Sequence, residues 1–266
     1  MDKLAALRQY FGFSEFRAGQ QTLIDAVLSG RDALGIMPTG GGKSLCYELP
    51  ALLLPGITLV VSPLISLMQD QVKGLNAAGI HAAFINSSLT ETQIARALDL
   101  AAEGSYKLVY VAPERLESPV FRSFSAGADI SMVTVDEAHC ISQWGQDFRP
   151  SYLKILDFID SLPRRPIVSA FTATATREVK DDIVCTLRLH DPKVLVTGFD
   201  RPNLYFQVER TRRKDDFVIQ YLRDHPGESG IIYCATRANV EKVCDHLRQR
   251  GIPATRYHAG LSEAER

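Results

Sequence analysis

A glycine-rich stretch in the first fifth of the chain has the composition of a phosphate-binding loop. Residues 37–44 (MPTGGGKS) follow an apolar run and precede a segment of helical pattern. Glycines let successive N–H groups face phosphate oxygens, and the start of the following helix adds partial positive charge. Lys43 can reach the β- and γ-phosphates and the Ser44 hydroxyl can hold Mg²⁺, although Met37 replaces the usual first glycine. The predicted nucleotide-binding residues of this loop are Thr39, Gly40, Gly41, Gly42, Lys43 and Ser44.

Two adjacent carboxylates provide a second chemical group. Asp136 and Glu137 directly follow the apolar run 130–135, and His139 comes two residues later. Asp136 can bind Mg²⁺ directly or through water, while Glu137 can orient or deprotonate an attacking water. His139 is placed to sense the nucleotide. We therefore predict a nucleoside triphosphate hydrolysis site with Lys43 and these three residues as its catalytic groups.

Short apolar runs and longer amphipathic segments alternate from about residue 31 onward. The predicted strands are 33–37, 57–62, 82–85, 107–111, 132–135 and 167–171, and the predicted helices include 64–78, 91–102 and 152–162. Strands that are apolar on both faces indicate βαβ units and a parallel sheet covered by helices on both sides. The carboxyl ends of parallel strands share one edge, so the phosphate loop and Asp136 are expected to meet there.

The composition is that of an ordinary globular protein, with 266 residues, 45% of them hydrophobic and 23% charged. A net charge of −1 gives no global basic field, although a local groove of Arg and Lys can still bind DNA. Five scattered cysteines without a C-x-x-C pair predict reduced thiols and no zinc site. The chain shows neither an apolar signal core nor a membrane-length run, so we expect a cytoplasmic protein without a membrane partner.

The order of several motifs resembles the RecQ family of superfamily 2 DNA helicases. The phosphate loop, D-E-A-H (136–139) and SAFTATAT (169–176) are similar to motifs I, II and III. CISQWGQDFRPSY (140–152) resembles the aromatic-rich loop that marks this family, and FGFSEFRAGQ (11–20) resembles its motif 0. Further matches are SPLISLM (62–68), APERL (112–116) and FDRPN (199–203), so the resemblance covers essentially the whole chain.

The resemblance implies a P-loop, RecA-like ATP-binding domain over residues 1–198, a linker at 199–207 and an incomplete second RecA-like domain at 208–266. It implies that Gln20 hydrogen-bonds the adenine edge, with Arg17 and Phe13 helping to hold the base. It also implies an ATP- and Mg²⁺-dependent enzyme that acts on single-stranded DNA and duplex junctions in DNA repair and recombination.

The aromatic-rich loop is the expected DNA sensor. Its Trp144, Phe148 and Arg149 can stack on bases regardless of sequence, and Thr172 and Thr174 of motif III are implied to take part in DNA coupling. Because the loop directly follows Asp136 and Glu137, DNA contact can reset the hydrolytic site. The alternative for Trp144 is a buried aromatic that anchors the loop. Gln146 stands where family members usually carry histidine, and we hypothesise that this uncharged amide alters the coupling.

The second unit has fewer residues than a complete α/β domain requires. Predicted helices at 217–224 and 239–250 accompany predicted strands at 230–234 and 254–257, and Ser262 is expected to cap a last helix. GIIYCATR (230–237) resembles motif IV, and the arginines of motifs V and VI are expected to lie beyond Arg266. We therefore expect a truncated chain, in which motif VI arginines that approach the γ-phosphate are missing.

Two functions of different classes fit these motifs. The first is an ATP-dependent DNA helicase that translocates 3′ to 5′, with the polarity implied by the resemblance. The second is a non-catalytic, ATP-gated DNA-binding module. A P-loop kinase or an RNA helicase is disfavoured because neither explains the Trp144 loop. Protein partners are not predicted by the sequence.

Overall fold

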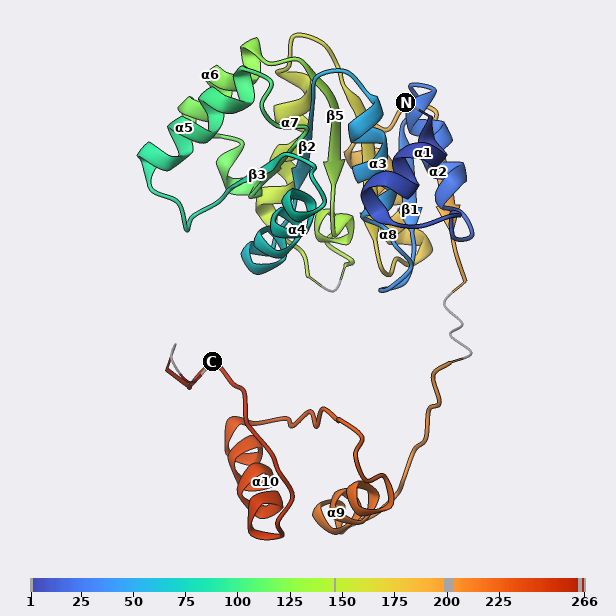
Figure 1. Ribbon diagram of the computed structural model, residues 1–266, viewed down its shortest axis with the longest axis vertical. Coiled ribbons are helices and arrows are strands. Elements are labelled where there is room, and N and C mark those ends of the chain that lie inside the picture. Colours follow the sequence, from blue (N-terminus) through green and yellow to red (C-terminus); the bar gives the residue numbers. More distant parts are fainter. Residues whose placement is uncertain (1, 146, 199–202, 263–264, 266) are drawn as a thin grey trace. The chain divides into compact units, whose positions relative to one another are not determined.

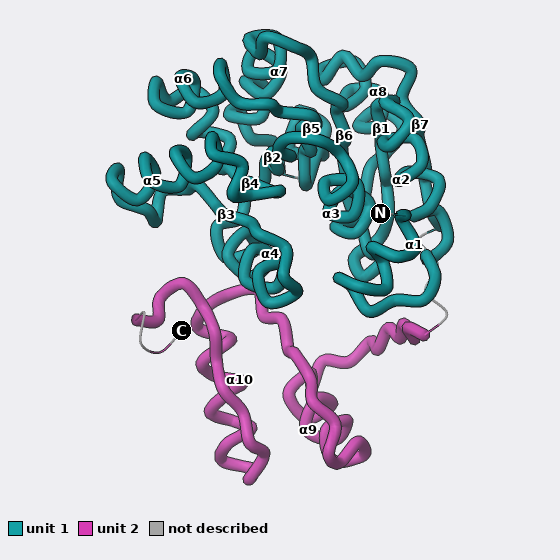
Figure 2. The backbone as a smooth tube through the Cα atoms, turned by 45° about the horizontal axis from the view of Figure 1, so that its top comes forward, with its two compact units in different colours: residues 1–200 teal, residues 201–266 magenta. Residues whose placement is uncertain are grey.

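The computed structural model describes residues 2–145, 147–198, 203–262 and 265. The chain divides into two compact units, Met1–Asp200 and Arg201–Arg266, which Figure 2 shows in teal and magenta. The first unit carries the phosphate loop and the D-E-A-H acids.

The first unit is built on a seven-stranded sheet in the order β3-β4-β2-β5-β6-β1-β7, and every neighbouring pair is parallel. The predicted parallel α/β fold is therefore confirmed. The strands are β1 (Ala33–Ile36), β2 (Ile57–Val61), β3 (Ala82–Ile85), β4 (Leu108–Val111), β5 (Ile130–Val135), β6 (Ile167–Thr172) and β7 (Lys193–Val196). The predicted strands match the first six. β7 was not predicted, because it is an edge strand whose residues alternate between half-buried and exposed.

Helices surround the sheet in Figure 1. They are α1 (Lys3–Ala6), α2 (Gln20–Leu28), α3 (Leu45–Leu53), α4 (Ile65–Ala77), α5 (Glu91–Ala102), α6 (Pro119–Gly127), α7 (Lys154–Asp160) and α8 (Arg177–Thr186). Shorter helical turns are the π-helical η1 (Leu7–Phe11) and the 3₁₀ turns η2 (Pro113–Arg115), η3 (Ala138–Ile141) and η4 (Pro150–Leu153). The predicted helices at 64–78 and 91–102 are confirmed, and that at 152–162 appears as η4 followed by α7.

The two faces of the sheet belong to two different hydrophobic cores. Successive residues of a strand point to opposite faces. In β2, Leu59 and Val61 therefore pack in one core together with buried residues of α5 to α8, whereas Val60 packs in the other with residues of α2 to α4. Helices on both faces explain why the strands are apolar at consecutive positions. Because both faces of the sheet are covered by apolar cores, polar residues are found mainly at the ends of the strands.

The amino edge of the sheet is held by one buried carboxylate. Asp32 is 2% exposed and directly precedes β1. Its oxygens accept hydrogen bonds from the Arg165 guanidinium (2.6 and 3.3 Å) and from the backbone N–H groups of Val168 (2.8 Å) and His190 (2.7 Å). Asp32 thus connects the starts of β1 and β6 with the segment between α8 and β7. We name these four residues the Asp32 knot.

The second unit contains two helices in its described residues, α9 (Lys214–Asp224) and α10 (Arg237–Gln249). They confirm the two predicted helices. The predicted strands at 230–234 and 254–257 are wrong, because no residue of either segment is in a strand. A strand needs a neighbour for its backbone hydrogen bonds, and the described residues of this unit provide none. Ile231 and Tyr233 are accordingly 81% and 90% exposed.

Part of the expected linker, residues 199–202, lies outside the described residues, as do 263 and 264 of the expected last helix. Across the part of the chain that is described, no helix combines the length and apolar character needed to cross a membrane.

Candidate nucleotide and DNA site

The phosphate loop lies between the end of β1 and the start of α3, as its sequence predicts. Lys43 Nζ donates a hydrogen bond to the Met37 carbonyl (3.2 Å), which keeps the ammonium over the loop. Gly42 has a φ of +79°, and a Cβ atom there would lie 2.3 Å from Gln20 Nε2. Only glycine fits this position, so the loop backbone can stay open to an incoming phosphate.

The upstream segment braces the phosphate loop. Gln20 is 2% exposed; its amide oxygen accepts from the Arg17 N–H (2.8 Å) and its amide nitrogen donates to the Gly42 carbonyl (3.0 Å). The Arg17 guanidinium donates to the Gly40 carbonyl (2.5 Å). The structure therefore brings both residues to the loop that holds phosphate. Their contact with adenine stays a prediction, as does that of Phe13, whose side chain is about half exposed.

Asp136 lies at the carboxyl edge of the sheet, directly after β5, and is 7% exposed. Its N–H donates to the Val61 carbonyl (2.9 Å), and the buried Tyr152 hydroxyl donates to its carbonyl (3.0 Å). Burial, and then the charge of Glu137, raise the pKa of Asp136 to about 6, while Lys43 acts in the opposite direction. A carboxylate in this environment is stabilised by a nearby cation, as expected of a Mg²⁺ ligand.

Glu137 and His139 form a pair beside Asp136. Glu137 has a left-handed φ of +47°, a strained conformation for a residue other than glycine. The hydrogen bond from His139 and the Lys43 charge lower the pKa of Glu137 against the effect of burial. The Cys140 sulfur and the Glu137 carboxylate raise the pKa of His139. The Glu137 carboxylate and the His139 ring therefore favour each other's charged forms.

His139 also connects the D-E-A-H segment to motif III. Its Nδ1 lies 2.9 Å from Thr172 Oγ1 at the end of β6 and 3.3 Å from Glu137 Oε2. The Thr172 hydroxyl donates to the Thr174 carbonyl (3.1 Å), so it accepts from His139, and Nδ1 is protonated. Thr172 is fully buried and Thr174 is exposed. Thr172 thus fits a role in coupling rather than in direct DNA contact.

The residues at this edge fit ATP and Mg²⁺. The loop offers backbone N–H groups, an ammonium and the Ser44 hydroxyl, and Asp136 provides a buried carboxylate. Mg²⁺ is bound in such sites by one or two protein oxygens, with phosphate oxygens and water completing its shell. Among the described residues, no three His, Cys, Asp or Glu side chains gather into a cage for a metal. This donor set suits a cation that arrives with a nucleotide.

The aromatic-rich loop projects its tryptophan into solvent. Trp144 is 77% exposed, so the alternative of a buried anchor is wrong. Phe148 is half-buried, and Arg149 pairs with Asp147 (2.7 and 3.0 Å) and donates to the Pro63 carbonyl (3.1 Å). The base of the loop is closed by the Arg149 N–H, which donates to the Cys140 carbonyl (2.9 Å). Gln146 lies outside the described residues.

A buried acid behind the phosphate loop was not predicted. Glu48 of α3 is 6% exposed, and the Tyr110 hydroxyl donates to its Oε1 (3.1 Å). Burial raises the pKa of Glu48 to about 7, the Tyr110 hydrogen bond acts against this, and the Asp136 charge adds to it. Within an apolar helix, the lone Glu48 in the sequence LCYELP could have indicated a buried carboxyl, but its Tyr110 partner is 62 residues away.

Glu48 makes the stability of the free protein depend on pH. In the unfolded chain its carboxyl ionises near 4.5, and in the folded chain near 7, so the folded state binds more protons between these values. Stability from this group therefore falls as pH rises through that window. Glu48→Gln keeps a hydrogen-bond acceptor for Tyr110 without the charge. We expect it to raise the free energy of unfolding by about 2 kcal/mol at pH 8 and very little at pH 5.

Urea unfolding of both proteins at the two pH values measures this effect. Glu103→Gln, at the exposed end of α5, is the matched control and is expected to change neither value. An equal gain for Glu48→Gln at pH 5 and pH 8 would show that side-chain packing, and not ionisation, is responsible.

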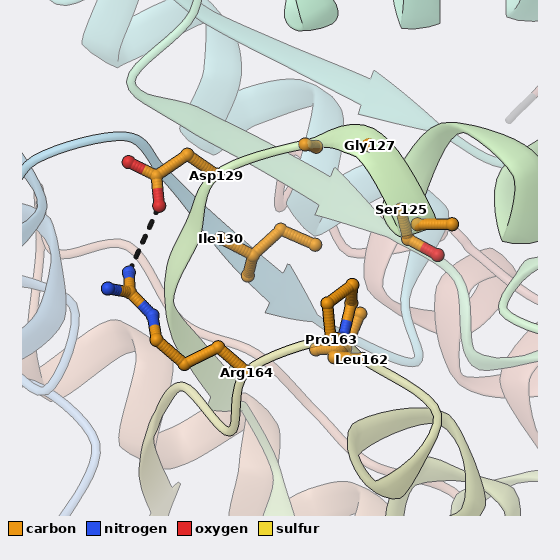
Figure 3. A pocket seen from close by; sticks show the side chains of 9 residues that line it. Ser125, Gly127, Asp129, Ile130, Leu162, Pro163 and Arg164 are labelled. Carbon is orange, nitrogen blue, oxygen red and sulfur yellow. Dashed lines mark hydrogen bonds and ion pairs between the residues drawn. The ribbon is translucent and has the colours of Figure 1, made fainter.

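A pocket of about 270 Å³ lies at the amino edge of the sheet, where β5 begins (Figure 3). It is bordered by Gly127, Leu162 and Pro163, and the Asp129–Arg164 ion pair (3.0 Å) lies beside it. Asp129 precedes β5 and Asp136 follows it, and a six-residue strand spans about 20 Å. This pocket is therefore separate from the predicted nucleotide site.

Comparison with known proteins agrees with this geometry. A sequence profile described as DEAD/DEAH box helicase matches residues 17–182. The ATP-dependent DNA helicase RecQ of Bacillus subtilis is 47% identical over 258 residues, covering 97% of this chain and 44% of the relative. RecQ of Pasteurella multocida is 44% identical over 263 residues, covering 99% and 42%. The chain thus spans less than half the length of these curated relatives.

Solved structures share the fold. The DUF1998 helicase MrfA bound to DNA superposes with a TM-score of 0.71 at 18% identity, over 94% of this chain and 38% of that one. The helicase domain of Hef from Pyrococcus furiosus gives a TM-score of 0.54 at 18% identity, over 88% and 53%. The profile match covers more than half of the chain and includes both the phosphate loop and the D-E-A-H acids. The chain therefore belongs to the DEAD/DEAH box helicase family, and its relatives there include the RecQ DNA helicases.

Proposed function

We propose that this chain supplies the ATP-hydrolysing part of a RecQ-type DNA helicase that translocates 3′ to 5′. The observation that carries the proposal is the continuity of the described residues 136–145. The acid pair is held at the carboxyl edge of the sheet, and an exposed tryptophan follows Glu137 by only seven residues. A change at the loop can therefore reach the hydrolytic groups through a short stretch of ordered backbone.

Each residue of the site has a separate task in ATP hydrolysis. The loop N–H groups and Lys43 hold the phosphates, and Ser44 and Asp136 hold the Mg²⁺ that neutralises developing charge. Glu137 orients the attacking water and accepts its proton. His139 Nδ1 donates to Thr172 and forms an ion pair with Glu137, so the ring holds the carboxylate in place and connects it to motif III.

DNA acts on this site through the aromatic-rich loop. An exposed indole such as Trp144 can stack on a base of any sequence and contribute about 1–3 kcal/mol. Arg149 can exchange its Asp147 partner for a phosphate. Because the Arg149 N–H closes the base of the loop onto Cys140, movement of its side chain is coupled to the segment next to His139. ATP turnover should therefore depend on DNA.

The finer parts of the proposal rest on the resemblance to RecQ proteins. They are the 3′-to-5′ polarity, action at junctions of single-stranded and duplex DNA, and a role in repair and recombination. A protein that works on chromosomal DNA must share its compartment. The RecQ relatives of Bacillus subtilis and Pasteurella multocida come from bacteria, whose DNA lies in the cytoplasm, and that is the location we propose for this chain.

ATP hydrolysis with and without single-stranded DNA tests the proposal. We expect DNA to stimulate phosphate release by the purified chain, and Lys43→Ala to reduce it to background because the phosphates lose their ammonium. A Trp144→Ala variant should bind ATP but lose most of the stimulation. If ATP and DNA both bind and turnover stays at the Lys43→Ala level, the non-catalytic, ATP-gated DNA-binding module is the correct function for these residues.

A further inference from the structure

The exposed loop is tied to a distant helix by one buried hydroxyl. Ser142 is 1% exposed and begins the segment that carries Trp144. Its hydroxyl donates to Asp182 Oδ2 (2.7 Å) and accepts from the Trp144 N–H (3.2 Å). A hydroxyl that donates to a carboxylate and accepts from a backbone N–H uses its one proton and is held in one orientation. The position of the Trp144 backbone therefore depends on where Asp182 holds Ser142.

Asp182 belongs to the segment that leaves motif III. It lies on α8, which begins after Thr172 and Thr174 and is capped by Thr176, whose hydroxyl accepts from the Val179 N–H (3.3 Å). The D-E-A-H segment and the motif III segment are thus joined twice. One connection is His139–Thr172 (2.9 Å) at the nucleotide side, and the other is Ser142–Asp182 (2.7 Å) at the loop.

Close packing at Gly145 makes the start of the loop stiff. The Gly145 N–H donates to the Ser142 carbonyl (2.9 Å), and a Cβ atom at Gly145 would lie 2.3 Å from the His139 carbonyl oxygen. The Ser142 N–H in turn donates to the His139 carbonyl (3.2 Å). Residues 139–145 therefore form a tight turn with little freedom. A shift of Ser142 must move Trp144 with it.

We propose that Asp182 is a positioning residue for DNA-stimulated ATP hydrolysis, which acts by holding Ser142 and so fixing the resting conformation of the Trp144 loop. The proposal deepens the helicase function proposed above and rests on it. Asp182 acts through its hydrogen-bond partner Ser142. It connects the loop that meets DNA to the helix that follows motif III, so movement of either is transmitted to the other.

Neighbouring Asp181 provides a matched control. It stands one residue away on the same helix, is 61% exposed, and pairs only with Lys180 (3.2 Å) and Arg177 (4.0 Å) among the described contacts. Asp181→Ala and Asp182→Ala remove the same groups from α8. Any general effect of losing an aspartate from this helix appears in both variants, whereas the loop connection is lost only in the second.

The single tryptophan of the sequence makes the loop directly observable. Trp144 is the only tryptophan in the 266 residues, so fluorescence excited at wavelengths that the nine tyrosines do not absorb reports this loop alone. Time-resolved anisotropy of the protein without ATP or DNA measures its local motion. We expect Asp182→Ala to increase the amplitude of the nanosecond motion, and Asp182→Asn, whose amide oxygen still accepts from Ser142, to restore most of the wild-type value. Asp181→Ala should match wild type.

The functional measurement is the concentration of single-stranded DNA that gives half-maximal ATPase stimulation. We expect it to rise roughly five- to tenfold in Asp182→Ala, in keeping with the loss of one hydrogen bond to a carboxylate, and to recover in Asp182→Asn. Far-UV circular dichroism confirms that each variant is folded. Unchanged Trp144 motion in a folded Asp182→Ala variant would overturn the proposal, as would an Asp182→Asn variant no better than Asp182→Ala.

The two measurements separate the proposals from each other. The anisotropy requires no turnover, so it decides whether Asp182 holds the loop even if the wild-type chain does not hydrolyse ATP. Failure of DNA to stimulate the wild-type chain would count against the proposed function. If the Trp144 anisotropy of Asp182→Ala equals that of wild type, the result counts only against the proposed role of Asp182.

Discussion

Replacing Glu137 by glutamine is expected to reduce ATP hydrolysis by about a thousandfold while leaving ATP binding intact. Glutamine has the same shape and can still face His139, but it cannot accept a proton from the attacking water. The Glu137 backbone has a strained φ of +47°. Its carboxylate is stabilised by the hydrogen bond from His139 and by the charge of Lys43. Such strain at a non-glycine residue persists only where surrounding contacts enforce it, and it is common at catalytic groups.

Phosphate release and binding of a fluorescent ATP analogue, measured on the same preparations, distinguish the two effects. Glu103→Gln, on the exposed end of α5, is the control for loss of one surface carboxylate and should retain both wild-type values. If the Glu137→Gln variant hydrolyses ATP at the wild-type rate, a group other than Glu137 activates the water. Asp136, the other carboxylate at this edge, would then be tested next.

Removing Asp32 is expected to lower the free energy of unfolding of the first unit by about 4 kcal/mol. Asp32→Ala leaves the buried Val168 N–H without its acceptor. It also removes the acceptor of the exposed His190 N–H and of the Arg165 guanidinium, whose side chain is 30% exposed. Donors left unpaired in the interior lose their water without any replacement. A loss of this size is a large fraction of the total stability of a domain.

Asp32→Asn separates hydrogen bonding from packing, because it preserves the side-chain volume. Each Asp32 oxygen accepts from two donors, so an amide NH₂ in place of either oxygen would face two N–H groups. We therefore expect no rescue. Asp160→Ala, which breaks the exposed pair with Arg188 (3.2 Å), should change stability by about 0.5 kcal/mol or less. Urea unfolding followed by circular dichroism measures all three, and a loss for Asp32→Ala no greater than that of Asp160→Ala would contradict the role of the Asp32 knot.

Local pattern was sufficient to predict most of the first unit. The first six strands and the phosphate loop follow from short apolar runs and glycines, which act through neighbouring residues. The strand β7 was not predicted because Lys193–Val196 is partly exposed and is the last strand at one side of the sheet. The two strands predicted in the second unit were wrong because an apolar run shows strand propensity but says nothing about its partner.

The contacts that could not be predicted join residues distant in the sequence. Asp182 lies 40 residues from Ser142, and the donors to Asp32 lie 133 to 158 residues away. Gln20 was expected at the adenine, and the structure shows its amide bonded to Gly42, 22 residues away. The chemical type of each residue was visible in the sequence, but its partner depends on the order of strands in the sheet.

The direction of the parallel strands places the Asp32 knot at one edge of the sheet and Lys43, Asp136 and Thr172 at the opposite edge. Protein engineering can use this separation. Random libraries restricted to the loops at the amino edge should yield variants that differ widely in thermal tolerance while keeping similar turnover, because the length of the strands separates the varied positions from the phosphate loop. Libraries at the carboxyl edge should behave in the opposite way, with activity varying more than melting temperature.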